Sequence, residues 1–147
     1  MTSEEELFLV YAQGKYPFTV PQVRRLVEIR MEPTVMLHRG EVVGFANFYS
    51  YREGKSVFIG NVVVDRSLRG KGLGKRLVCY MMDRAFSEHD LRSVRLHVYN
   101  RNLPALLLYS SLGFQPHAMK AKRDYKGDPV MLFTLVSRRD AWLERPR

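Results

Sequence analysis

The sequence predicts an α+β fold with three layers, in which a mixed, mostly antiparallel seven-stranded sheet is flanked by helices. Short runs of β-branched and aromatic residues alternate with turn residues, which is typical of strands joined in hairpins. Two other segments carry apolar residues at helical spacing, and one of them separates two apolar runs, as in a strand–helix–strand crossover. At 147 residues, the chain is expected to form one domain spanning residues 1–147.

The N-terminal part of the chain predicts one helix and four strands. An apolar run at residues 7–12 predicts the first strand. Thr19 is a suitable N-cap with Pro21 in the first turn, so a helix is expected from there until Pro33 ends it. Turn residues at 39–41 and 52–55 then separate three further expected strands, at 34–38, 42–51 and 57–64. The two hairpins form an antiparallel meander.

The second half of the chain predicts two helices and three strands. From Gly72 to about residue 89 the apolar residues form a stripe that would pack on the sheet. The run at 94–98 follows strand 57–64 across this helix, so the two strands should pair in parallel. Asn102 would cap the next helix and Gly113 would end it. Two final strands at 116–125 and 129–136 precede a basic tail at 137–147.

A glycine-rich basic segment, Arg69-Gly-Lys-Gly-Leu-Gly74, links strand 57–64 to the helix. Glycine lets backbone N–H groups approach a ligand closely, and a helix N-terminus offers unpaired N–H groups with partial positive charge. The segment therefore predicts an anion site, with phosphate as the expected anion. The Walker motif is excluded because Arg69 replaces its first glycine and Arg76 its hydroxyl residue. The dinucleotide motif is excluded because Lys75 replaces its third glycine.

A different phosphate pattern, Arg/Gln-x-x-Gly-x-Gly/Ala, is met by Arg69, Gly72 and Gly74. This segment is similar to the acetyl-CoA pyrophosphate loop of the GNAT N-acetyltransferase superfamily. A second motif of that superfamily, Asn-x-x-Ala-x-x-x-Tyr-x-x-x-Gly-Phe, matches the chain from Asn102 to Phe114. The chain thus resembles GNAT enzymes over about residues 42–136. The resemblance implies the GNAT-like acyl-CoA N-acyltransferase fold, whose central parallel strands splay apart to leave a slot for the cofactor.

The resemblance also implies which residues hold acetyl-CoA. Backbone groups of Val62, Val63 and Val64 would contact the pantetheine arm and the acetyl carbonyl. Asn102 and Ala105 would line the same arm, and Tyr109 would stand beside the sulfur. The pyrophosphate would be held by the loop residues Arg69, Gly70, Lys71, Gly72, Leu73, Gly74 and Lys75.

The implied reaction is direct transfer of acetyl from acetyl-CoA to a primary amine in a ternary complex. The amine could belong to a protein N-terminus, a lysine or a small molecule. A backbone N–H near Val63 or Val64 would stabilise the oxyanion, and the catalytic Tyr109 would protonate the leaving thiolate. Two alternatives stay open, because a fold does not determine a function. One is a basic RNA- or ribosome-binding module, and the other is a non-catalytic acyl-CoA sensor.

The general base is the part of the site that the sequence leaves open. Many GNAT enzymes place Glu about six residues before the last valine of the strand, where this chain has Phe58. Neither Phe58 nor Asn61 can accept a proton, so we expect an amine of low pKa, a water relay or a carboxylate from elsewhere. Glu28 and Glu32, near the end of the first helix, are the candidate carboxylates. His97 points away from the core residues beside it, toward solvent or the other sheet face.

The composition of the chain limits the ligands and partners that we expect. The formal net charge of +9 would suit nucleic acid, anionic lipid or acidic ligands, although part of it lies in the glycine-rich loop. A single cysteine, Cys79, excludes an internal disulfide, and we expect no metal. The acidic start and the lack of a ~20-residue apolar run predict a cytoplasmic protein with no membrane partner. The expected partners are acetyl-CoA and an amine, and a homodimer is left open.

Overall fold

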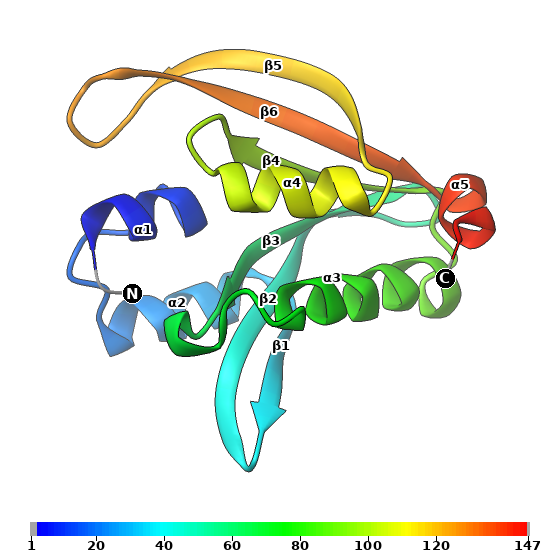
Figure 1. Ribbon diagram of the computed structural model, residues 1–147, viewed down its shortest axis with the longest axis horizontal. Coiled ribbons are helices and arrows are strands. Elements are labelled where there is room, and N and C mark those ends of the chain that lie inside the picture. Colours follow the sequence, from blue (N-terminus) through cyan, green and yellow to red (C-terminus); the bar gives the residue numbers. More distant parts are fainter. Residues whose placement is uncertain (1–2, 147) are drawn as a thin grey trace.

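A computed structural model describes residues 3–146, which form a mixed sheet with helices around it (Figure 1). The strand order in the sheet is β1-β2-β3-β4-β6-β5. The strands are β1 Met31–His38, β2 Glu41–Arg52, β3 Ser56–Val64, β4 Ser93–Tyr99, β5 Gln115–Arg123 and β6 Pro129–Arg138. The helices are α1 Glu4–Val10, α2 Val20–Ile29, α3 Leu73–Asp83, α4 Leu103–Ser111 and α5 Arg139–Glu144, with short helical turns η1 Arg66–Leu68 and η2 Arg84–Glu88.

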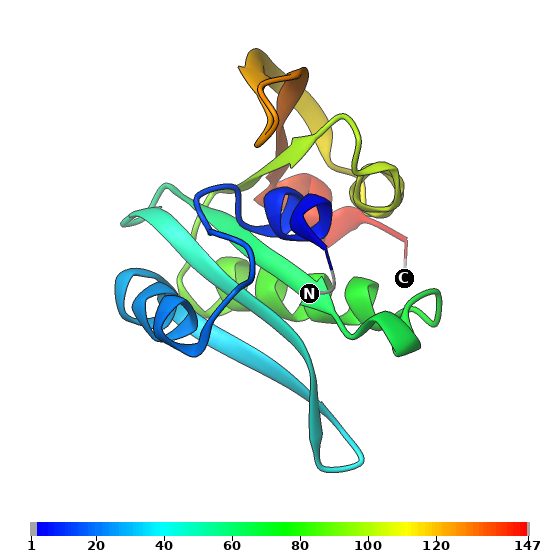
Figure 2. The ribbon, with the colours of Figure 1, turned by 90° about the vertical axis from the view of Figure 1, so that its left-hand side faces the viewer.

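The sheet confirms the predicted α+β class and its parallel central pair. Strands β3 and β4 are parallel and joined through α3, whereas the other neighbouring strands are antiparallel. The main core lies on one face, where Val57, Ile59 and Leu96 of the sheet pack with Met81 of α3 and Leu112 after α4. Helix α2 lies on the opposite side of the sheet, and α1 lies beside β3 and β4 (Figure 2).

The predicted strand at residues 7–12 is wrong, because this segment belongs to helix α1. The side chain of Ser3 accepts a hydrogen bond from the Glu6 backbone N–H at 3.0 Å and caps the helix. Three glutamates in the first turn complement the partial positive charge of the helix N-terminus. The described residues therefore form six strands rather than the predicted seven.

The predicted helix from Thr19 is shorter than expected. It ends at Ile29, and Pro33 lies inside β1 instead of terminating the helix. Because β1 is an edge strand, the missing N–H of Pro33 need not interrupt the sheet. Residues 93–99, 115–123 and 129–138 form the three remaining strands close to their predicted positions.

The segment predicted as a basic tail contains helix α5, and Trp142 anchors it in the core; Arg147 lies outside the described residues. Trp142 is 1% exposed, and its Nε1–H donates to Asp83 Oδ1 at 3.1 Å. Helix α5 is thus part of the folded unit.

Replacing Trp142 with Ala should lower the free energy of unfolding by about 3–5 kcal/mol, because it removes a large buried side chain. Chemical denaturation measures the loss. The matched control is Leu143→Ala at the adjacent, half-exposed position, where a much smaller loss is expected. A similar loss for both variants would contradict the placement of Trp142.

Candidate active site

Strands β3 and β4 separate halfway along their length, and a cavity opens where they part. Their pairing runs from Ser56–Ser93 to Ile59–Leu96 and ends there. The cavity has a volume of about 910 Å³ and is walled by α1, β3, the glycine-rich loop, β4 and α4. Its size suits an extended ligand together with a small second molecule.

A β-bulge at Asn61 accompanies this separation. The register between β2 and β3 shifts between the pairs Phe45–Val63 and Asn47–Gly60, so β3 carries one extra residue there. Asn61 takes a positive φ of 54°, a conformation that Asn tolerates better than most residues. Its side chain accepts from Asn47 Nδ2 at 2.9 Å and donates to the Val10 carbonyl at 3.0 Å. Asn61 therefore ties α1 to the bulge.

Nearly all of the predicted site residues line this one cavity, although they come from β3, the loop, α3 and α4. The exception is Lys71, which is exposed and lies outside the cavity wall. The lining residues among those predicted are Val62, Val63, Val64, Arg69, Gly70, Gly72, Leu73, Gly74, Lys75, Asn102, Ala105 and Tyr109.

The glycine-rich loop presents backbone rather than side chains to the cavity. Gly70 and Gly72 have φ values of 78° and 82°, which glycine adopts freely. The space beside both Cα atoms is open, since a Cβ built there meets nothing within 4 Å. No side chain caps α3, so its first N–H groups are available to a ligand. These features fit the phosphates of a CoA-type ligand.

Arg69 fastens this loop to its surroundings. Its Nε donates to the Val64 carbonyl at 2.9 Å, and its guanidinium forms an ion pair with Glu6 of α1. The side chain therefore holds the loop against the end of β3 while its charge stays at the cavity wall.

Helix α4 contributes its N-terminal end and one buried phenol. The Asn102 side chain accepts from the Ala105 N–H at 3.4 Å, so Asn102 caps the helix as predicted. Tyr109 is 7% exposed and packs edge-on against Phe114, with ring centroids 5.7 Å apart. Burial raises the pKa of the Tyr109 hydroxyl, and the nearby Tyr49 raises it further. The phenol is therefore a protonated donor over the whole physiological range.

His97 lies on the same cavity, on the wall formed by β4 and β2. Its ring stacks on Phe58 at 4.7 Å between centroids, and Tyr49 stacks on Phe58 at 5.2 Å. The rings of Tyr49 and His97 are 6.4 Å apart, so the three rings form one cluster. His97 Nδ1 is 3.1 Å from Thr134 Oγ1, which orients the ring. Burial lowers the pKa of His97, and the positive charge of Lys122 lowers it further. The imidazole is therefore neutral at pH 7 and able to accept a proton.

Neither candidate carboxylate from the sequence reaches the cavity. Glu32 forms ion pairs with Arg84 and His89, which together lower the pKa of its carboxyl despite the opposing effect of burial. Glu28 lies on the exposed side of α2, 3.9 Å from Arg25. The sequence could not assign a role to His97, because strand alternation shows which side of the sheet the residue faces but not what lies on that side.

Comparison with known proteins identifies the family. The model of the acetyltransferase (GNAT) family matches residues 5–114. The chain belongs to the GNAT family. A spermine/spermidine N(1)-acetyltransferase of Bacillus subtilis (strain 168) is 27% identical over 107 residues, which cover 69% of this chain and 68% of that protein.

Two solved structures share the fold. A spermidine N-acetyltransferase (SpeG) variant from Vibrio cholerae superposes with a TM-score of 0.69 at 19% identity, covering 76% of this chain and 67% of that one. The protein smu.2055 of Streptococcus mutans gives 0.71 at 24% identity and covers 92% of both chains. The chain is accordingly an N-acetyltransferase of the acyltransferase class, and enzymes of this family use acetyl-CoA as co-substrate.

In the described part of the chain, no helix has the length and apolar character to cross a bilayer.

Proposed function

We propose that this GNAT enzyme transfers acetyl from acetyl-CoA to the primary amine of a small molecule, with both substrates bound together. The observation that carries this proposal is one continuous cavity that the glycine-rich loop and Tyr109 share with His97. The similarity to a Bacillus subtilis enzyme named for small polyamines supports a small-molecule acceptor.

The cofactor half of the cavity would bind acetyl-CoA through the backbone. The N–H groups of Gly70 to Lys75 would receive the pyrophosphate at the start of α3. The edge of β3 beyond Ile59, which is no longer paired with β4, would bind the pantetheine arm. The bound cofactor supplies an acetyl thioester, an acyl donor that is reactive toward amines.

Three groups of the chain would then act on the reacting atoms. His97 would take a proton from the attacking amine, and a backbone N–H near Val63 or Val64 would stabilise the charge on the carbonyl oxygen. As the new C–N bond forms and the C–S bond breaks, Tyr109 would donate its proton to the leaving sulfur. Solvent would then return a proton to Tyr109 and take one from His97.

Direct transfer is favoured over an acetyl-enzyme intermediate. Cys79 lies on α3 outside the residues that wall the cavity. Among the described residues, no cysteine therefore stands where it could take the acetyl group first. The amine itself is the nucleophile that the cavity would accommodate.

Thermal unfolding with acetyl-CoA tests the cofactor half. Acetyl-CoA should raise the Tm of the wild-type protein, because a ligand that binds only the folded state stabilises it. In Gly72→Ala the positive φ would strain a Cβ-bearing residue by about 1–2 kcal/mol. Acetyl-CoA should therefore raise the Tm of this variant much less than it raises the Tm of the wild type.

The matched control is Gly54→Ala in the β2–β3 turn, where φ is 68° and the space beside Cα is likewise open. It should be destabilised comparably yet keep the full Tm shift with acetyl-CoA. The same reduced shift in both variants would contradict the placement of the pyrophosphate at the loop, and no shift in the wild type would overturn the proposed function.

A further inference from the structure

The end of the cavity away from the glycine-rich loop is cationic. Arg30, at the end of α2, and Lys122, on β5, both line the cavity there with His97 and Tyr49. Phe58, whose ring stacks on those of both Tyr49 and His97, precedes Val64 by six residues on β3. This end therefore lies on the order of 20 Å from the loop. Its cations are too far away to bind the phosphates that the loop would hold.

These two cations have no carboxylate partner in the part of the chain that the structure describes. The Arg30 guanidinium lies 4.0 Å above the centroid of the Tyr49 ring, and its buried Nε has no hydrogen-bond partner. Lys122 acts on His97 only as a nearby positive charge. A guanidinium held against an aromatic ring still offers its fork of N–H donors to a planar anion.

The carboxylates that line the cavity are already paired. Glu6 is held by Arg69, and Glu5 accepts from Arg101 at 3.1 Å. Glu5 and Glu6 therefore cannot offset the positive charge of Arg30 and Lys122. A polyamine, which carries several positive charges, would meet like charge at this end.

We infer that the acceptor is a small amine that also carries a carboxylate, held by Arg30 and Lys122 while His97 deprotonates its amine. This inference rests on the proposed function and specifies its substrate class. It departs from the polyamines in the names of the similar enzymes. Charge-assisted hydrogen bonds to the carboxylate would supply the binding energy and the orientation.

Free-thiol release from acetyl-CoA with matched amines tests the inference. The pairs are 4-aminobutyrate with butylamine and phenylalanine with phenethylamine, and spermidine is assayed beside them. The carboxylated member of at least one pair should have a kcat/KM about tenfold or more above its partner and above spermidine. Equal values within each pair, preference for the plain amine or spermidine, or turnover of neither member would overturn the inference.

Charge reversal at Lys122 gives the second arm. Lys122→Glu should lower kcat/KM for the carboxylated amine by about tenfold or more and raise it for the plain amine. Lys120→Glu, which makes the same charge change two residues away on β5 and outside the cavity wall, should leave both values nearly unchanged. Equal effects of the two variants would overturn the inference.

The proposed function is tested separately within the same assay. Turnover of spermidine alone, with stabilisation by acetyl-CoA, would refute the inference that the acceptor carries a carboxylate. It would leave the proposed acetyltransferase function standing. Absence of both thiol release and stabilisation would refute the site itself.

Discussion

Replacing Tyr109 with Phe should lower kcat by about 10²–10⁴-fold, the range in which a positioned general acid contributes. The phenol is buried, its pKa is raised by burial, and its ring packs against Phe114, so it would deliver a proton at a defined place. The variant retains the ring and therefore the packing. Steady-state thiol release measures the effect, and stabilisation by acetyl-CoA should persist.

A matched substitution outside the cavity shows whether the loss of kcat comes from the position of the Tyr109 hydroxyl or from removal of any tyrosine hydroxyl. Tyr80 lies on α3, is 52% exposed and does not line the cavity. Tyr80→Phe should keep the wild-type kcat. If Tyr109→Phe also kept it, Tyr109 would not be the general acid, and its role would be limited to packing beside the cofactor.

Replacing His97 with Gln should lower kcat by about 10²-fold near pH 7 and remove the acidic limb of the pH–rate profile. Only neutral imidazole accepts a proton, so the wild-type rate should rise as the pH rises through the His97 pKa, which lies below the usual value of about 6.5. Glutamine keeps a hydrogen-bonding side chain near Thr134 but cannot act as the base. A pH series of kcat values measures both effects.

The same shift predicts a dependence of stability on pH. Because the His97 pKa is lower in the folded than in the unfolded state, the unfolded chain binds the proton more readily. The contribution of neutral His97 is therefore fully present above about pH 6.5 and is lost as the pH falls through its folded-state pKa. His97→Gln should unfold with less sensitivity to acid over this range.

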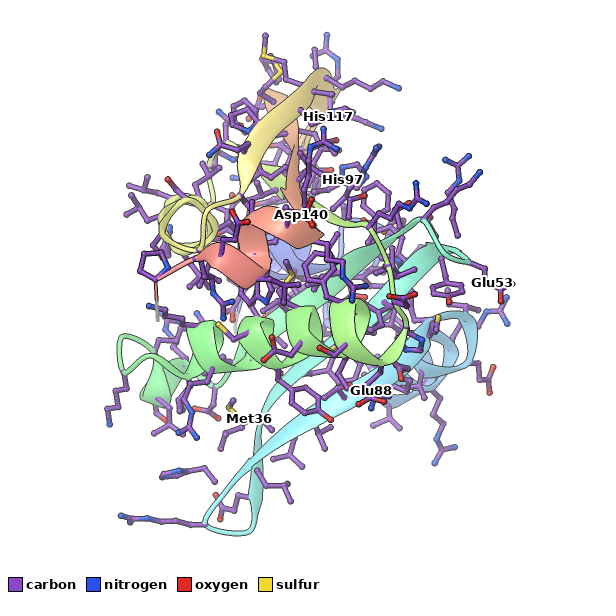
Figure 3. All side chains as sticks on the ribbon, turned by 90° about the vertical axis from the view of Figure 1, so that its right-hand side faces the viewer. Met36, Glu53, Glu88, His97, His117 and Asp140 are labelled. Atoms are coloured by element: carbon purple, nitrogen blue, oxygen red, sulfur yellow. The ribbon has the colours of Figure 1, made fainter. Side chains whose placement is uncertain are left out.

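His117 provides the control for the histidine experiments. It is exposed on β5 and lies outside the cavity wall, and Figure 3 shows it on a different strand from His97. His117→Gln should keep the rate and the acidic limb. Persistence of the limb in His97→Gln would assign the proton acceptor to another group.

The cofactor half of the cavity could be predicted from the sequence because its signals are local. The glycines, the helix start after them and the Asn102 cap each lie within a few residues, so their geometry follows from short-range chemistry. The bulge at Asn61 also depends on a hydrogen bond to Val10, 51 residues earlier. Nothing in the strand itself shows that contact.

The other half of the cavity, where the amine would bind, could not be predicted, because its residues lie far apart in the sequence. Arg30 follows the last residue of α2, and His97 and Lys122 lie on β4 and β5, so only the sheet order brings them to one wall. The prediction of a strand at residues 7–12 failed because a short apolar run fits either a strand or a buried helix. The Ser3-x-x-Glu6 pattern of a capping box could have corrected it.

We propose that one cavity holds acetyl-CoA and an amine together and that acetyl passes directly between them. The most direct measurement follows thiol release and N-acetyl product in the same reaction, with mass spectrometry of the protein during turnover. Direct transfer should give one product per thiol, thiol release that depends on the amine, and no acetylated protein. Release without the amine, a stable acetyl-enzyme, or no release with any amine would contradict it.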